Sequence, residues 1–134
     1  MGISWKKRFE IGVEEIDKQH KELFEQTERL LKACQEKRGS EELESLLEFL
    51  GNYVQTHFET EEKLQKKYNY PDYKEHKKAH NDFVKKIEEF KQEFKEGKKN
   101  VASLMRLNRT ITRWLVNHIK KEDQGLGDYI KGNS

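Results

Sequence analysis

The chain has 134 residues, enough for one domain with a modest hydrophobic core. Charged residues form 39% of the sequence and hydrophobic residues 33%, but the hydrophobic residues recur at helical intervals, which indicates long exposed helix faces and excludes a disordered chain. The formal net charge is +2 with lysines interleaved among glutamates, which argues against nucleic-acid binding, and no apolar run approaches the ~20 residues that cross a membrane.

The first element, residues 1–13, is predicted to be an extended arm that lies over the domain. It carries four large apolar residues without a sustained helical period, Trp5, Phe9, Ile11 and Val13. Leaving these side chains in water costs free energy, so we expect the arm to bury them against the helices. The segment has no apolar core of a signal peptide, and Cys34 is the only cysteine, so no internal disulfide can form. We therefore expect a soluble, cytoplasmic protein.

Four amphipathic helices follow the arm, each with apolar residues at intervals of three and four. Their predicted ranges are residues 14–37, 40–68, 71–97 and 100–124. Gly39 and Gly97 are expected to end the first and third helices. Ser40 is a suitable N-cap, and Pro71 suits the first turn of a helix. Short connections between such helices predict an all-α fold, an antiparallel up-down-up-down four-helix bundle with an extended N-terminal arm.

The whole chain, residues 1–134, is expected to form a single domain. Its parts are the arm at 1–13, the bundle at 14–124 and a tail at 125–134. Three apolar residues of the tail are expected to add a short helical turn, Leu126, Tyr129 and Ile130. The sequence contains no low-complexity segment and no internal repeat beyond the two helical hairpins.

All five histidines of the chain fall on apolar helix stripes. They are His20, His57, His76, His80 and His118. If an apolar stripe covers about three of seven positions, chance would place all five there in only about 1–2% of cases. In an antiparallel bundle the four helix ends that carry them are the same end, and a rise of about 1.5 Å per residue puts each one to three turns inward. The imidazoles are therefore expected to converge at one level of the core.

Convergence of five imidazoles with the carboxylate of Glu61 predicts a metal site. Without a metal, many buried polar groups would lack partners at about 1–3 kcal/mol each, against a total domain stability of about 5–15 kcal/mol. The ligands are also too many for one ion, so two metals bridged by carboxylates fit better. Imidazole with carboxylate suits iron, manganese or zinc, and availability and redox use favour iron.

The residue pattern leaves the second bridging carboxylate open. Glu122 lies four residues after His118 and shares its helix face, whereas Asp123 lies five residues on and is turned about 140° away on a regular helix. A fraying last turn can relax that angle, so both acids stay candidates. In the second helix, Glu62 is an alternative to Glu61 as the metal-binding acid, but its side chain is expected to point outward.

Several runs of residues, taken together along the chain, resemble the pattern of a known protein family. They are Trp5, the run Gly12 to His20, the run His57-Phe58-Glu59-Thr60-Glu61-Glu62, Tyr70-Pro71 leading to His76-Lys77-Lys78-Ala79-His80, and the run Trp114 to Asp123. This pattern covers nearly the whole chain and resembles the hemerythrin family, in particular the single-domain bacterial hemerythrins. Myohemerythrin is itself a four-helix bundle, so the resemblance implies the same fold.

The resemblance also implies a ligand set for two iron ions. One iron would be held by His76, His80 and His118, and the other by His20 and His57. Glu61 and Asp123 would bridge the two, together with an oxo or hydroxo group, so the resemblance selects Asp123 over Glu122. The first iron would then have six ligands and the second five, which leaves one position for O2.

The implied function is reversible O2 binding for storage, delivery or sensing, with no enzymatic role and no nucleic-acid or membrane partner. Four apolar residues within a turn of the ligands are candidates for the lining of an O2 pocket, although ordinary core packing explains each equally well: Leu23, Phe58, Leu115 and Ile119. A di-iron redox enzyme that acts on peroxide, nitric oxide or ferrous iron is the alternative. A purely structural metal site, such as zinc, is the third hypothesis.

Overall fold

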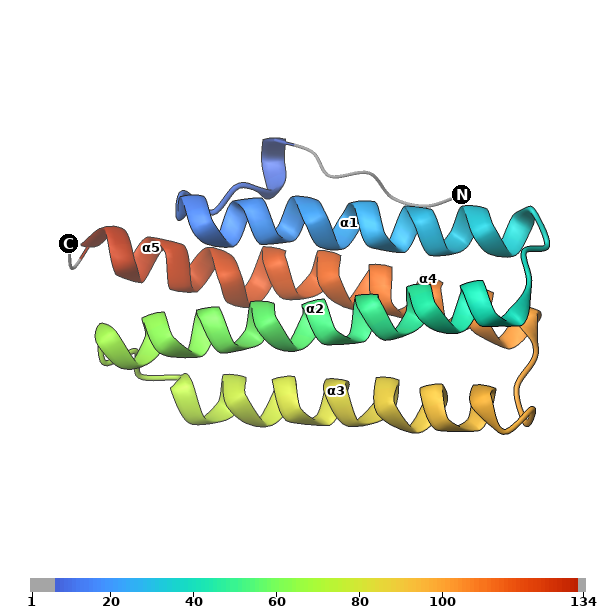
Figure 1. Ribbon diagram of the computed structural model, residues 1–134. Coiled ribbons are helices and arrows are strands. Elements are labelled where there is room, and N and C mark those ends of the chain that lie inside the picture. The colour runs from blue at the N-terminus through green and yellow to red at the C-terminus, as the bar shows by residue number, and fades with distance from the viewer. Residues whose placement is uncertain (1–6, 133–134) are drawn as a thin grey trace.

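The computed structural model describes residues 7–132 and shows four long antiparallel helical rods (Figure 1). The elements are η1 (Lys7–Phe9), α1 (Glu14–Gln35), α2 (Ser40–Lys67), α3 (Tyr73–Lys95), α4 (Val101–His118), the π-helix η2 (Ile119–Asp123) and α5 (Gln124–Gly132). No β-strand occurs among the described residues. The predicted all-α, up-down-up-down four-helix bundle is confirmed.

The fourth rod is longer than the sequence predicted. Helices α4 and α5 follow one another through η2 along one line, so the helix passes the expected end at Gly125 and reaches Gly132 (Figure 1). The π-helix keeps the backbone helical, and Leu126 and Ile130, four residues apart, are both buried. The tail is therefore more than the single helical turn expected from its apolar residues.

Residues with left-handed backbone follow the first three helices. Lys37 has φ of +56°, Asn69 of +54° and Gly97 of +76°. Gly97 follows α3 as predicted, because glycine adopts this conformation without steric cost. Gly39 does not end the first helix: α1 stops at Gln35, Lys37 makes the turn, and Gly39 has extended backbone directly before α2.

The N-terminal segment is held against the bundle by hydrogen bonds and by close packing. The carboxylate of Asp17 accepts hydrogen bonds from the backbone N–H groups of Ile11 (2.8 Å) and Gly12 (3.2 Å). Gly127 of α5 lies so close to the arm that a Cβ atom there would sit 2.4 Å from the backbone oxygen of Ile11. Residues 1–6 of the predicted arm, which include Trp5, lie outside the described residues.

Two apolar clusters fill the interior. The bundle cluster contains Leu23, Leu30, Ala33, Cys34, Leu43, Leu47, Leu50, Val54, Phe58, Phe83, Ile87, Phe94, Leu104, Ile111 and Leu115. The end cluster contains Phe9, Ile11, Ile16, Phe24, Ile119, Leu126 and Ile130. Buried His20 lies in sequence between Ile16 of one cluster and Leu23 of the other, and His118 lies likewise between Leu115 and Ile119. A buried polar layer therefore separates the two clusters.

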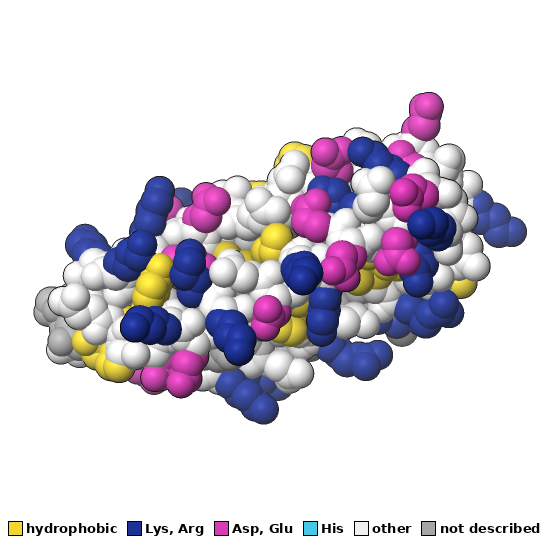
Figure 2. Space-filling model, turned by 90° about the horizontal axis from the view of Figure 1, so that it is seen from below, with side chains coloured by type: hydrophobic (Ala, Val, Ile, Leu, Met, Phe, Trp, Pro, Cys, Tyr) yellow, Lys and Arg dark blue, Asp and Glu magenta, His cyan; other side chains and the backbone are white. Residues whose placement is uncertain are grey.

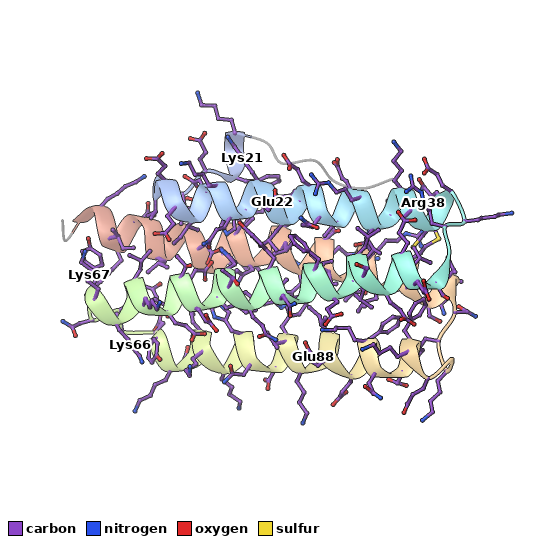
Figure 3. The ribbon with its side chains drawn as sticks, viewed as in Figure 1. Lys21, Glu22, Arg38, Lys66, Lys67 and Glu88 are labelled. Carbon is purple, nitrogen blue, oxygen red and sulfur yellow. The ribbon has the colours of Figure 1, made fainter. Side chains whose placement is uncertain are left out.

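The outer surface carries the charged residues expected of exposed helix faces. On the face shown in Figure 2, basic and acidic side chains are intermixed and no histidine is visible. Arg38, labelled in Figure 3 at the α1–α2 connection, donates hydrogen bonds to Glu36 (2.8 Å) and Glu42 (2.6 Å). Exposed pairs of this kind contribute little to stability. Among the described helices, none has the length and apolar character needed to cross a membrane.

Replacing Gly127 with Ala tests the contact between the arm and α5. The added methyl group meets a backbone oxygen that cannot rotate away, so we expect Gly127→Ala to lower the free energy of unfolding by about 1–3 kcal/mol in urea denaturation. Gly132→Ala is the matched control, because no atom lies within 4 Å of its added Cβ. Equal stability of the two variants would show that the arm does not pack as described.

Candidate metal centre

Seven histidine and carboxylate side chains meet in the polar layer. They come from every helix of the bundle and are at most 6% exposed: His20, His57, Glu61, His76, His80, His118 and Asp123. Burying so many ionisable groups is unfavourable unless they pair with one another or with a metal. The structure thus brings all five sequence-predicted histidines to one level, with Glu61 and Asp123 among them.

The two oxygens of Glu61 face two different groups of imidazoles. Oε1 lies 2.6 Å from Nε2 of His57 and 3.7 Å from Nε2 of His20. Oε2 lies 3.3 Å from Nε2 of His118 and 3.4 Å from Nε2 of His80. One carboxylate therefore spans both halves of the layer, as a bridging ligand must.

Asp123 repeats this arrangement. Its Oδ2 lies 2.8 Å from Nε2 of His20, and its Oδ1 lies 3.0 Å from Nε2 of His118. Two overlapping donor groups result, each with its atoms within 4.8 Å of one another. They are His20, His57, Glu61 and Asp123 in one group, and Glu61, His80 and His118 in the other.

Several of these inward atoms lack a hydrogen bond. Nε2 of His57 and Oε1 of Glu61 approach to 2.6 Å, yet neither has a partner of acceptable geometry, and the same holds for Nε2 of His80 and Oδ1 of Asp123. Buried polar atoms are almost always satisfied in folded proteins. Ring nitrogens and carboxylate oxygens that face one another without a hydrogen bond are atoms that a shared cation can bind, so the donor set is suited to metal ions.

His76 stands at the edge of the second group. Its ring centroid lies 6.3 Å from that of His80 and 6.4 Å from that of His118, but its nitrogens belong to neither donor group. Its Nδ1 faces the side-chain Nε2 of Gln65 at 2.8 Å, which leaves the other ring nitrogen available to a metal. A metal there requires a proton on Nδ1, and a half-turn of the Gln65 amide presents Oε1 as the acceptor.

The π-helix η2 explains why Asp123 reaches the site. In η2 the backbone N–H of Gln124 bonds to the oxygen of Ile119, five residues earlier, so one turn holds an extra residue. The fifth residue after His118 thereby returns to the same face, and Asp123 is fully buried. The 140° separation predicted for a regular helix does not apply. The side chain of Glu122, the competing candidate, lies outside the described part of the chain.

Residues next to the ligands bind the outer ring nitrogens, and the sequence analysis missed this role. His57 donates from Nδ1 to Oε1 of Gln19 at 2.9 Å, and Gln19 in turn donates to the hydroxyl of Thr60 at 3.0 Å. His80 donates from Nδ1 to Oε2 of Glu62 at 3.0 Å. Such bonds fix the tautomer and orientation of a metal-binding imidazole. Glu62 does point away from the centre, as predicted, but it contacts a ligand candidate.

The proposed pocket residues divide between the two apolar clusters. Leu23, Phe58 and Leu115 belong to the bundle cluster, whereas Ile119 belongs to the end cluster. The Phe58 ring stacks on the His80 imidazole with centroids 3.8 Å apart and planes inclined by 3°. Trp114, which the sequence analysis did not include in the pocket, stacks on the imidazole of His118 at 4.5 Å.

The electrostatics of the metal-free cluster favour an ionised Glu61 beside a protonated His20. Burial lowers the pKa of His20, but its hydrogen bonds with Asp123 and Glu61 outweigh burial and raise the pKa from 6.5 to about 9. Burial opposes ionisation of Glu61, yet the neighbouring imidazoles, led by His57 and His118, bring its pKa well below the usual value. Burial lowers the pKa of His57, so that imidazole stays neutral. A protonated His20 therefore pairs with the buried carboxylates of Asp123 and Glu61 when no metal is bound.

A pH titration of the metal-free protein tests this charge balance. The stabilisation from protonated His20 is complete below pH 6.5 and is lost as pH rises toward 9, because the folded pKa is the higher one. We expect the free energy of unfolding in urea to fall over that range by on the order of 2 kcal/mol. His20→Gln, which cannot ionise, should lack this decline. A wild-type profile that is flat or rises between pH 6.5 and 9 would contradict the assignment.

Comparison with known proteins identifies relatives of this chain. A family model described as the hemerythrin HHE cation binding domain matches residues 11–130. The bacteriohemerythrin of Stenotrophomonas maltophilia strain R551-3 is 30% identical over 131 residues, which cover 98% of this chain and 83% of that protein. The myohemerythrin of Theromyzon tessulatum is 33% identical over 119 residues, which cover 89% of this chain and 86% of that protein.

Solved structures give the same result. The crystal structure of a hemerythrin with a single substitution superposes with a TM-score of 0.88 at 30% sequence identity, over 96% of this chain and 98% of that chain. Hemerythrins bind a di-iron centre, and the cluster described above has the histidine and carboxylate donors to hold metal ions. Because the family model spans all four helices and every residue of that cluster, the chain belongs to the hemerythrin family.

Proposed function

We propose that this protein binds O2 reversibly at a di-iron centre and serves in O2 storage, delivery or sensing. The observation that carries the proposal is the position of Glu61, whose two oxygens face two separate groups of imidazoles. Such a carboxylate suits a pair of ions better than a single one. A di-iron pair supplies reversible two-electron chemistry with O2, which zinc, having no redox chemistry, lacks.

The proposed ligand assignment follows from the two donor groups and the family resemblance. His76, His80 and His118 hold one iron, His20 and His57 hold the other, and Glu61 and Asp123 bridge them. His76 is included because its ring lies beside those of His80 and His118 with one nitrogen unused by Gln65. With two histidines against three, the iron held by His20 and His57 would have room for one further ligand, and we propose that O2 binds there.

The surrounding side chains supply the apolar shelter that reversible binding needs. Water and external acids must be kept from the bound O2, because they promote loss of electrons from the centre. Leu23, Phe58 and Leu115 cover the layer from the bundle cluster, and Ile119 covers it from the end cluster. All four side chains are at most 3% exposed, which supports their role as apolar cover for the cluster.

The first test is a visible spectrum of protein loaded with iron and reduced without air, with iron counted per chain. We expect about two irons, colour on exposure to O2, and loss of colour when O2 is removed. Irreversible oxidation with two irons retained would instead support the alternative enzyme, which acts on peroxide, nitric oxide or ferrous iron. An iron form with no colour and no O2 response would support a structural metal site.

Substitution of the bridging acids tests the ligand assignment. We expect Asp123→Asn to reduce the iron content below two per chain, because an amide is a poorer bridging ligand than a carboxylate. Glu122→Gln, the adjacent substitution of the same type, should keep two irons. The opposite result in metal analysis would assign the bridge to Glu122.

Removing a histidine from the open side tests where O2 binds. We expect His57→Ala to abolish reversible O2 uptake in a gas titration, because one of the two histidines proposed to hold that iron is lost. Thr56→Ala changes the preceding residue of α2, an exposed threonine whose hydroxyl donates to the backbone oxygen of Asn52 in the same helix, and this variant should bind O2 normally. Normal uptake by His57→Ala would contradict the assignment.

A further inference from the structure

The outer nitrogens of three histidines contact side chains of different charge. His57 donates to the neutral amide of Gln19, and His76 lies against the neutral amide of Gln65. His80 instead donates to the carboxylate of Glu62 at 3.0 Å. Among these three hydrogen bonds, the one at His80 is the only one with an anionic partner.

Acceptor charge changes what an imidazole supplies to a metal. A carboxylate on the Nδ1–H group draws the proton toward itself and makes the opposite Nε2 a stronger donor than a neutral amide does. A stronger donor stabilises the more highly charged, oxidised metal ion. The Nε2 of His80 faces Oε2 of Glu61 at 3.4 Å, so this effect acts directly on the layer that holds the bridging carboxylates.

A cation at the surface opposes the charge of Glu62. Lys77 of α3 donates from Nζ to Oε1 of Glu62 at 3.1 Å, while Oε2 of the same carboxylate accepts from His80. The side chain of Glu62 is 13% exposed and that of Lys77 is 46% exposed. Both line a hollow of about 340 Å³ between α2 and α3, together with His80 and Glu59. A buried imidazole is thus connected to a solvent-facing ion pair through one carboxylate.

We propose that Glu62 is a positioning residue that lowers the reduction potential of the metal bound by His80, and that Lys77 raises it. Glu62 does so by holding His80 with its proton on Nδ1 and by placing a negative charge next to the ring. Lys77 partly neutralises that charge. This inference rests on the ligand assignment given under the proposed function.

The sign of each charge makes the test specific. We expect Glu62→Gln, which keeps an acceptor but loses the charge, to raise the potential measured by anaerobic redox titration. At fixed applied potential the ratio of reduced to oxidised protein should rise about tenfold, which is 59 mV for one electron. Lys77→Gln should shift the potential in the opposite direction. Glu59→Gln removes an exposed acid from the same hollow without contact to a histidine, and should leave the potential unchanged.

A second readout does not depend on iron. In zinc-loaded protein, long-range ¹H–¹⁵N spectra report which ring nitrogen of His80 carries the proton. We expect Nδ1 to be protonated in the wild type and in Glu62→Gln. In Glu62→Leu, which has no acceptor, that proton should exchange with solvent faster. Unchanged exchange in the leucine variant would overturn the positioning role.

The outcomes separate this inference from the proposed function. Fewer than two irons in the wild-type protein would refute the di-iron assignment itself. Two irons with equal potentials for Glu62→Gln and Glu59→Gln would overturn the role of Glu62 alone. If Glu62→Gln fails to retain iron, Lys77→Gln still decides the matter, because a potential equal to or above that of the wild type refutes the charge mechanism.

Discussion

The constraint on which the structure depends is a buried carboxylate held between imidazoles. Glu61 is fully buried, and its oxygens lie within 3.7 Å of four histidine nitrogens from all four rods of the bundle. Charged groups in such surroundings are tolerated only when they are closely paired. Each helix must therefore place its donor at the same depth, and a shift of one helix by a single turn of about 5.4 Å would remove a ligand.

Apolar packing on both sides of the polar layer keeps the helices in that register. The bundle cluster fills the interior toward the α1–α2 connection, and the end cluster closes the other side with residues of the arm and of α5. The long fourth rod packs in both clusters. Its Leu115 belongs to the bundle cluster and its Ile119 to the end cluster, and His118 lies between them. The N-terminal arm is thus part of the enclosure of the site.

Helical periodicity was sufficient to predict the bundle and the meeting of five histidines, because both depend on which face of a helix a residue occupies. Asp123 was different. Its position depends on a π-helix, which a calculation with 3.6 residues per turn cannot anticipate, so the family resemblance selected it over Glu122. The roles of Gln19 and Glu62 were missed because an outer hydrogen bond depends on side-chain directions between neighbouring helices, which residue spacing does not reveal.

Two consecutive residues of α2, Glu61 and Glu62, face different surroundings. Glu61 and Glu62 are about 100° apart on the helix, so the first faces the centre while the second faces α3. Phe58, on the same side as Glu62, stacks on the ring of His80 that Glu62 holds by its Nδ1–H group. A rotation of α2 that moved the Glu61 carboxylate would also break the contact of Glu62 with His80. The helix therefore links the hydrogen bond on the outer nitrogen of His80 to the position of the Glu61 carboxylate.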